Sequence, residues 1–271
     1  MNYYQALNLE NNLEELLLNY FVFCIVYFLV FFLISVLRDD YSSVDSGWSI
    51  GIVLSTLLTY YFKTEAQTFY SKIIIFLVFI WGARLSLHRL VRNIRDGEDF
   101  RYQNLRIKWP KFFKTQIFFK VFLVQAILQF VVILPLIVGL NSPLPKIKFR
   151  FSLGIIVFII GFAIESISDF QLFSFKSLKK NHKKVLSSGM WKWCRHPNYL
   201  GEITLWWGIF LCCYTKNYKW IYTGPMMLTL FIAKISGVPL IERRFSHNKD
   251  YQLYKDRTGS IFPISKKPHS D

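Results

Sequence analysis

The sequence predicts an all-α protein, a polytopic bundle of transmembrane helices. Hydrophobic residues make up 53% of its 271 residues and aromatic residues 18%, and the mean hydropathy is positive; a water-soluble domain carries fewer apolar side chains than this. Apolar runs of the length that crosses a bilayer recur along the chain. The basic residues gather between pairs of these runs. These three observations together predict an integral membrane protein.

The first run, residues 16–37, contains no charged residue and has the length that a helix needs to cross a bilayer. Neither a basic segment nor a small-residue cleavage site precedes it, so we expect a first span rather than a removed signal peptide. Further apolar runs lie at residues 47–62, 73–90, 117–140, 151–175, 199–214 and 220–241.

These runs predict about seven spans, of which two are short or polar and could be tilted or partly re-entrant. Neither an internal period nor a Ser/Gly-rich linker divides the chain. Residues 1–271 are therefore predicted to form a single integral membrane domain.

The formal net charge of +16 is unevenly distributed, and its distribution predicts the topology. Two spans separate each basic cluster from the next, so the three clusters share one face, which the positive-inside rule identifies as cytosolic. The acidic N-terminus, with Glu10, Glu14 and Glu15, then falls on the far side. The clusters comprise Arg84, Arg89, Arg92, Arg95, Arg101, Arg106, Lys108, Lys111 and Lys114; Lys176, Lys179, Lys180, Lys183, Lys184, Lys192 and Arg195; and Arg243, Arg244, Lys249, Lys255, Arg257, Lys266 and Lys267.

We therefore expect an extracytosolic N-terminus and a cytosolic C-terminus, in the endoplasmic reticulum of a eukaryote or the inner membrane of a bacterium. A basic face suits anionic membrane lipids or a phosphorylated small molecule. Nucleic acid is not expected, because the basic segments lie against spans and contain no recognition module. Without CxxC or HExxH spacing, neither a disulfide framework nor a metal site is predicted. The oligomeric state has no signature in the sequence.

The stretch from Met190 to Glu202 carries the most informative motif. Pro197 suits the first turn of a helix, because its missing N–H would be unpaired there, so His196 is predicted near the helix cap. Asn198 and Glu202 then fall on the first turns. Free backbone N–H groups at such a start attract phosphate.

Arg195 adds a planar guanidinium beside these groups, so the segment predicts a site for a phosphate-bearing cofactor at the membrane surface. The alternative is an interfacial anchor, in which Trp and Tyr side chains lie at headgroup depth and the Arg195 side chain snorkels to the membrane interface. That alternative leaves Glu202 unexplained, since a carboxylate entering an apolar run is costly.

Polar residues also occur inside other spans. Glu165 and Asp169 are four residues apart and share a helix face. Asp169 either hydrogen-bonds a ribose or carboxamide of a ligand, or forms an interhelical salt bridge with Arg195 or Lys176.

The third run carries Arg84, His88, Arg92 and Arg95 at helical spacing, and the first two lie deep enough to need partners. Asp45 precedes the second run and is either a functional acid or a helix cap. Beyond His247, Tyr251 and Tyr254 are predicted on one face of a helix that acts as a lid or rests on the membrane surface.

Several segments resemble the steroid 5-alpha-reductase-like membrane proteins, especially their branch long described as a domain of unknown function. The resemblance runs from the second span to near the C-terminus. It rests on Val44-Asp45 with Trp48, Trp81-Gly82 with Arg84 and Leu85, Gly97-Glu98-Asp99 with Arg101-Tyr102, Glu165 with Asp169 and Gln171-Leu172, Gly189 to Trp207, Ser236 to Glu242, and Tyr251 to Pro263.

The resemblance implies that residues 141–271 bind NADPH and that the spans within residues 1–140 line the substrate side. It implies reduction of a carbon–carbon double bond in a lipophilic enone, steroid or sterol-like lipid, by hydride addition at the β-carbon and protonation at the α-carbon. For the chemistry at the substrate we expect His88, Asp45 and Arg84. The expected cofactor-binding residues are Asp169, Arg195, His196, Asn198, Tyr199, Glu202, His247 and Tyr251.

The chain departs from the steroid reductases at the catalytic end. Ser86 stands ahead of His88-Arg89 where those enzymes have Tyr, and Asp45 is the nearest acid to their second-span Glu. One alternative is an S-adenosylmethionine-dependent methyltransferase of the isoprenylcysteine carboxyl type, which has a similar Arg-His-Pro-x-Tyr-x-Gly segment but an acidic pair where this chain has Glu242-Arg243. A non-catalytic lipid-binding membrane protein is the other.

Overall fold

The computed structural model describes residues 3–62, 68–142, 148–181 and 184–263. Within these ranges every regular element is a helix and there is no strand, which confirms the all-α class. Three members of the predicted basic clusters lie outside the described residues: Lys183, Lys266 and Lys267. The chain divides into two compact units, Met1–Leu144 and Pro145–Asp271.

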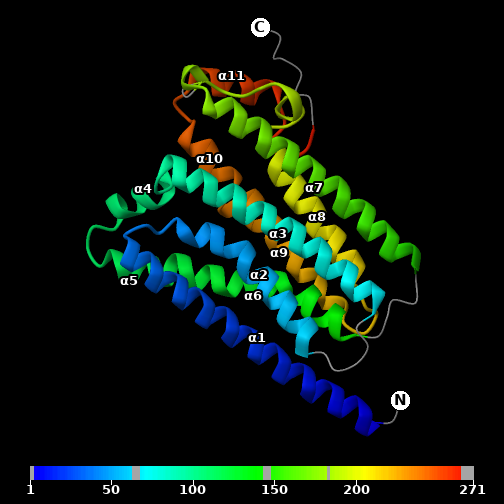
Figure 1. The fold of residues 1–271 in the computed structure, drawn as a ribbon. Coiled ribbons are helices and arrows are strands. Elements are labelled where there is room, and N and C mark those ends of the chain that lie inside the picture. The colour runs from blue at the N-terminus through cyan, green and yellow to red at the C-terminus, as the bar shows by residue number, and fades with distance from the viewer. Residues whose placement is uncertain (1–2, 63–67, 143–147, 182–183, 264–271) are drawn as a thin grey trace. The chain divides into compact units, whose positions relative to one another are not determined.

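The first unit is built from long helices joined by short connections (Figure 1). Its most extensive packing joins the second and third helices, while the first and last helices pack on each other and on the second. In chain order the elements are α1 (Tyr3–Arg38), α2 (Ser43–Phe62), α3 (Phe69–Asp96), α4 (Phe100–Lys108), α5 (Phe113–Ile117), a π-helical turn (Phe118–Phe122) and α6 (Leu123–Asn141).

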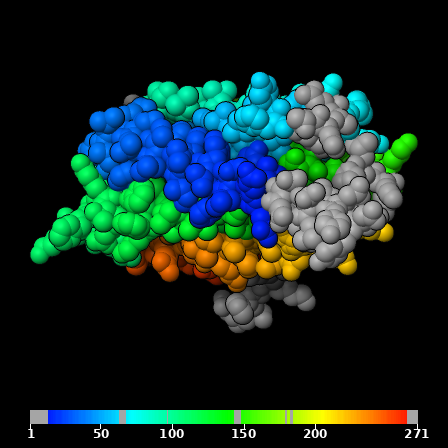
Figure 2. Space-filling view, turned by 90° about the horizontal axis from the view of Figure 1, so that it is seen from below, coloured from blue at the N-terminus to red at the C-terminus, as the bar shows by residue number. Residues whose placement is uncertain are grey.

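Helix α1 has one buried face and one exposed face, and the exposed face is apolar. Cys24 and Phe28 are buried, whereas Val26 and Leu33 are about half exposed. Figure 2 shows α1 in blue along the surface of the first unit, beside the green residues of α5 and α6. An exposed face with so little polarity is typical of a helix that contacts lipid.

The second unit begins with a long helical pair. Its elements are α7 (Lys148–Ser177), 3-10 turns at Lys179–Asn181 and Gly189–Lys192, α8 (Pro197–Cys213), a 3-10 turn at Lys219–Tyr222, α9 (Thr223–Leu230), a π-helical turn (Phe231–Ile235), α10 (Val238–Arg244) and α11 (Lys249–Arg257). Helices α7 and α8 run side by side (Figure 1).

Glycines bring the backbones of α7 and α8 into direct contact. A Cβ atom at Gly161 would lie 2.4 Å from the backbone nitrogen of Leu205, and one at Gly201 would lie 2.4 Å from that of Glu165. Small residues at a helix interface permit this close approach. The contact fixes the start of α8 beside the polar part of α7.

Five helices among the described residues are long and apolar enough to cross a membrane: Leu13–Arg38, Phe69–Arg95, Phe113–Asn141, Lys148–Ser177 and Lys219–Arg244. They support the prediction of an integral membrane protein. The two remaining predicted runs are also helical, as α2 and α8, but neither belongs to this set.

Candidate functional site

The second unit gathers polar side chains at the start of α8. Pro197 is the first residue of the helix and His196 is its N-cap, as the sequence predicts. The His196 side chain makes no capping hydrogen bond. The backbone N–H groups of the first turn are therefore not covered by the cap residue.

Arg195, directly before the cap, is a hub for the C-terminal segment. Its side chain is 3% exposed. The guanidinium Nη1 donates to the carbonyl oxygens of Thr258 and, at 3.2 Å, Lys255, and Nη2 donates to Glu242 Oε1 at 2.5 Å. The backbone N–H of Arg195 donates to the Gly259 carbonyl oxygen at 2.9 Å. Arg195 therefore joins the start of α8 to α10, α11 and the residues that follow.

Glu242, near the end of α10, is the anionic partner of this hub. Its Oε2 lies 3.0 Å from Lys255 Nζ, and its Oε1 lies 3.8 Å from His196 Nε2. Sequence reasoning missed this role for Glu242. The available signal was a carboxylate at the end of an apolar run, which needs a cationic partner.

His196 is buried, and its imidazole stacks on Tyr199 with the ring centroids 5.5 Å apart. Burial lowers the pKa of His196, and the nearby Glu242 carboxylate opposes this effect only in part. The neutral imidazole is therefore favoured. A neutral ring can donate from one nitrogen and accept at the other.

Helix α11 packs against the segment that precedes α8. The hydroxyl of Tyr254 hydrogen-bonds to the Trp191 carbonyl oxygen and lies 3.2 Å from that of Cys194. Tyr251 is also buried, stacks on Phe245, and has its pKa raised to about 12 by burial and by the charge of Glu242. The predicted helix with both tyrosines on one face is confirmed, and that face is buried within the unit.

Asp169 and Asn198 are brought together across the helical pair. The amide Nδ2 of Asn198 donates to Asp169 Oδ1 at 3.1 Å. Of the two cations considered as partners for Asp169, Arg195 pairs with Glu242, and Lys176 Nζ donates to the Lys184 carbonyl oxygen at 2.9 Å.

Two other predicted cofactor residues lie on α8 itself, and a third lies in the C-terminal segment. Tyr199 and Glu202 are half-buried on its first turns. His247 is exposed between α10 and α11, four residues before Tyr251.

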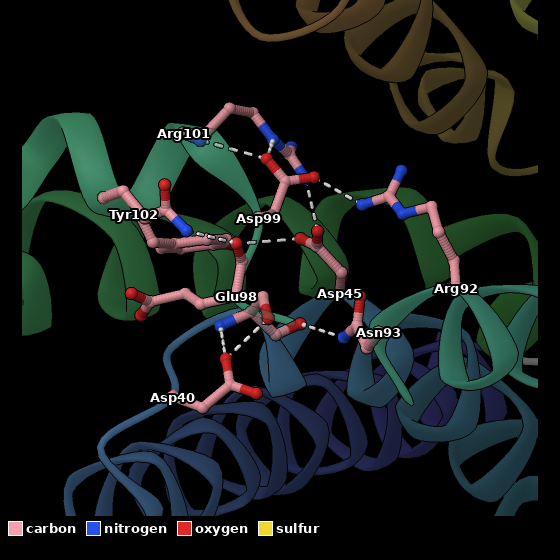
Figure 3. A network of polar contacts seen from close by, with 10 residues as sticks. Asp40, Asp45, Arg92, Asn93, Glu98, Asp99, Arg101 and Tyr102 are labelled. Carbon is pink, nitrogen blue, oxygen red and sulfur yellow. Dashed lines mark hydrogen bonds and ion pairs between the residues drawn. The ribbon is translucent and has the colours of Figure 1, made fainter. Parts of the chain in front are cut away.

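The first unit holds a second polar cluster, which surrounds Asp45 (Figure 3). Asp45 lies inside the first turn of α2, which begins at Ser43, so it is not the helix cap. Its Oδ1 accepts from the Tyr102 hydroxyl at 2.9 Å, and its Oδ2 accepts from Arg101. Arg101 also donates from Nε to Asp99 Oδ1 at 3.0 Å. Asp99 binds Arg92 of α3 as well.

Charge explains the stability of this cluster. Burial alone would raise the pKa of the Asp99 carboxyl, but the Arg101 and Arg92 guanidinium groups outweigh it and hold that pKa below its usual range. Burial and the charge of Asp45 raise the pKa of Tyr102 far above its ordinary value. The phenol therefore keeps its proton and acts as a donor.

Glu98 ties this cluster to the turn between α1 and α2. It accepts from the Tyr41 backbone N–H at 3.0 Å and from Arg106 Nε at 3.1 Å. The Gly97-Glu98-Asp99 segment, noted in the sequence for its resemblance, is thus the junction of α2, α3 and α4. Its contacts hold these helices together.

Arg84 and His88 are half-buried on α3, within the same stripe as Arg92. Ser86 lies between them in sequence, and its hydroxyl is 2.6 Å from that of Ser49 on α2. The position at which the steroid reductases carry Tyr is therefore occupied by one member of a serine pair. Within the described part of the chain, no three His, Cys, Asp or Glu side chains form a group suited to a metal ion.

Fold and site define an all-helical integral membrane protein with an ion-paired polar cluster in each of its two units. The chain belongs to the family described as protein of unknown function DUF1295, whose model matches residues 31–258. It is similar to an uncharacterised protein of Schizosaccharomyces pombe, with 21% identity over 266 residues that cover 88% of this chain and 77% of the yeast protein. No solved structure shows a significant match.

Proposed function

We propose that the protein is a membrane-embedded, NADPH-dependent reductase of a carbon–carbon double bond in a lipophilic enone, steroid or sterol-like lipid. The observation that carries the proposal is the contact between Asp169 and Asn198 at the start of α8. Both residues lie in segments that resemble the steroid 5-alpha-reductase-like proteins, Asp169 in the segment with Glu165 and Asn198 in the segment from Gly189 to Trp207. The stretch from Arg195 to Glu202 surrounds Asn198 in sequence.

The residues at this helix start fit a dinucleotide. Asn198 keeps its amide oxygen as an acceptor after donating to Asp169. The first-turn N–H groups, which His196 does not cap, suit a pyrophosphate. In this proposal Asp169, Asn198 and Glu202 contact the cofactor, and His196, Tyr199, His247 and Tyr251 lie around it. Bound NADPH would supply the hydride.

The proposed chemistry also needs groups that stabilise negative charge on the substrate oxygen as hydride arrives. We assign this role to Arg84 and His88, which can donate hydrogen bonds. Asp45, held by Arg101 and Tyr102, would order the polar end of the first unit. The lipophilic substrate and the surrounding lipids are the partners that this function requires.

The proposal includes a topology of seven spans, with α2 and α8 as the shorter two. The N-terminus would be extracytosolic and the C-terminus cytosolic, where NADPH is available. The support is the distribution of basic residues between pairs of spans. The membrane would be the endoplasmic reticulum in a eukaryote or the inner membrane in a bacterium.

Thermal unfolding of the purified protein in detergent, with NADPH, NADH or S-adenosylmethionine, tests the cofactor. A ligand that binds only the folded state raises the Tm. We expect NADPH to do so, and stabilisation by S-adenosylmethionine alone would instead support the methyltransferase alternative. Absence of any response would favour the non-catalytic lipid-binding alternative.

Variants locate the cofactor within the protein. Asn198→Ala and Glu202→Gln are expected to lose most of the NADPH-induced rise in Tm while still inserting and folding. Asp250→Asn, which makes the same carboxylate-to-amide change on an exposed residue of α11, is the control and should keep the full response. Normal NADPH binding by both site variants would show that the cofactor is placed wrongly.

A further inference from the structure

The contacts of Arg195 differ from those expected of a phosphate ligand. A guanidinium offers five N–H donors, and phosphate recognition uses two of them side by side in an open fork. Here Nη1 faces two backbone carbonyls and Nη2 faces the Glu242 carboxylate. With the side chain 3% exposed, Nη1 and Nη2 are occupied by the protein itself, and Nε is the buried donor of this guanidinium without a hydrogen-bond partner among the described residues.

The partners of Arg195 belong to one continuous C-terminal stretch. They lie on α10 at Glu242, on the last turn of α11 at Lys255, and beyond it at Thr258 and Gly259. The backbone N–H of His196 extends the pairing to the Ser260 carbonyl oxygen at 3.1 Å. Two consecutive backbone bonds and three side-chain bonds thus hold this stretch, residues 242–260, against the start of α8. We call residues 242–260 the C-terminal tail.

Two further side chains reinforce this attachment from α11. The Tyr254 hydroxyl binds the Trp191 carbonyl oxygen, on the segment leading into Arg195. Lys255 Nζ lies 3.0 Å from the second oxygen of Glu242. Glu242 is therefore held from both sides by cations, and it in turn orients the Arg195 guanidinium toward the tail.

We propose that Arg195 and Glu242 are a pair of positioning residues, which attach the C-terminal tail to the start of α8 and thereby fix the backbone and the Asn198 side chain that meet the cofactor. The attachment itself rests only on the contacts above, and its effect on NADPH rests on the proposed function. Glu242 becomes a residue required for cofactor binding although it does not touch the cofactor.

Glu242→Gln separates this role from direct phosphate binding, because the two predict opposite signs. If Arg195 were a phosphate ligand, removing a neighbouring negative charge would strengthen anion binding. If the pair positions the site, the same change weakens the attachment, since an ion pair between two charged groups becomes a hydrogen bond with only one charged partner. We expect NADPH affinity to fall by about tenfold, because a tenfold change corresponds to the free energy of about one hydrogen bond to a charged group.

The experiment combines two measurements on the full-length protein in detergent. Hydrogen exchange without nucleotide reports the attachment, through peptides that cover residues 191–200 and 250–262. Titration with NADPH reports the site. For Glu242→Gln we expect faster exchange in both peptides together with weaker NADPH binding, and Arg243→Gln, an exposed neighbour on α10, should change neither.

Combination with Arg195→Lys adds a test of coupling. If Arg195 and Glu242 act through the same attachment, the second substitution has nothing further to disrupt. The double variant Arg195→Lys with Glu242→Gln should therefore bind NADPH no worse than Arg195→Lys alone. If Glu242→Gln does not fold, Glu242→Asp keeps the charge and shortens the reach by one methylene, and it should produce the same two changes at smaller size.

Unchanged exchange together with tighter NADPH binding in Glu242→Gln would overturn the proposal and return Arg195 to the role of anion ligand. If Glu242→Gln exchanges faster but neither the unmodified protein nor any variant binds NADPH, the attachment is retained and the proposed function is removed. The two failures are therefore distinguishable.

Discussion

The two ion clusters of this protein are built around opposite charges. In the first unit the centre is a pair of carboxylates, Asp45 and Asp99, and most of their partners are side chains, with the Arg101 backbone N–H as a further donor to Asp99. In the second unit the centre is one guanidinium, Arg195, and most of its partners are backbone carbonyls. The Arg195 side chain is 3% exposed, whereas Arg101 is 28% exposed.

This difference determines how each cluster responds to the loss of one member. In the first, Arg101 binds both carboxylates, so when one of the two acids is lost Arg101 still pairs with the other. In the second, no other cation in the described contacts reaches the Thr258 and Lys255 carbonyls that Arg195 binds. The first cluster is redundant, and the second depends on a single residue.

The largest expected effect is therefore at Arg195. Arg195→Ala leaves two carbonyl oxygens without their buried donor and leaves Glu242 with Lys255 as its cationic partner, and breaking a buried pair costs about 3–5 kcal/mol of unfolding free energy. Unfolding in detergent, followed by helical circular dichroism, measures the loss. Arg243→Ala on the exposed side of α10 is the control and should change stability little. A loss at Arg195 no larger than that control would remove the claimed dependence on one residue.

The second effect tests redundancy in the first unit. Asp99→Asn removes the charge that faces Arg92 and Arg101, but Asp45 remains on Arg101. We expect a loss of about 2 kcal/mol, the range for a buried hydrogen bond to a charged group. Asp39→Asn, whose partner Arg106 also binds Glu98, serves as the exposed control. If Asp99→Asn destabilises as much as Arg195→Ala, the two clusters do not differ in the way described.

Local chemistry was predictable at several of these positions. Pro197 placed the start of α8 correctly, because the missing N–H restricts proline to a first turn. The apolar runs predicted helices, and the three-residue spacing of Tyr251 and Tyr254 predicted a shared face. These inferences use only neighbours along the chain.

Pairings between distant segments were not predictable in the same way. Arg195 and Glu242 are 47 residues apart, and a long cationic side chain near a membrane surface has many anionic partners within reach. Asp45 illustrates the same limit, because its position before an apolar run fits a cap, whereas its partners Arg101 and Tyr102 lie more than fifty residues away. Tertiary packing selects these partners, and it leaves no periodic signal in one sequence.

A matched pair of tyrosines gives the third prediction. Tyr102 donates to a carboxylate in the first cluster, and Tyr254 donates to a backbone carbonyl in the second. Removing a hydrogen bond to a charged group costs about 1.5–3 kcal/mol, against about 0.5–1.5 kcal/mol for a neutral acceptor. Tyr102→Phe should therefore destabilise more than Tyr254→Phe in the same unfolding measurement. Tyr222→Phe, at an exposed position, is the control, and the reverse order would contradict the difference in acceptor charge.

The smallest expected effect is a difference in acid sensitivity. Burial lowers the pKa of His196 in the folded protein, so its contribution is present above the unfolded value of about 6.5 and declines as pH falls below it. The loss is small because Glu242 offsets part of the burial. The Asp99 pKa is also lowered, but from an ordinary value of about 3.9, so the first cluster keeps its contribution until pH falls below about 4.

Hydrogen exchange at pH 7.5 and pH 5, corrected for the intrinsic rate, should therefore show faster relative exchange at pH 5 in residues 191–200 and little change in residues 98–108. His196→Gln should remove this pH difference, and its persistence in that variant would assign it to another group.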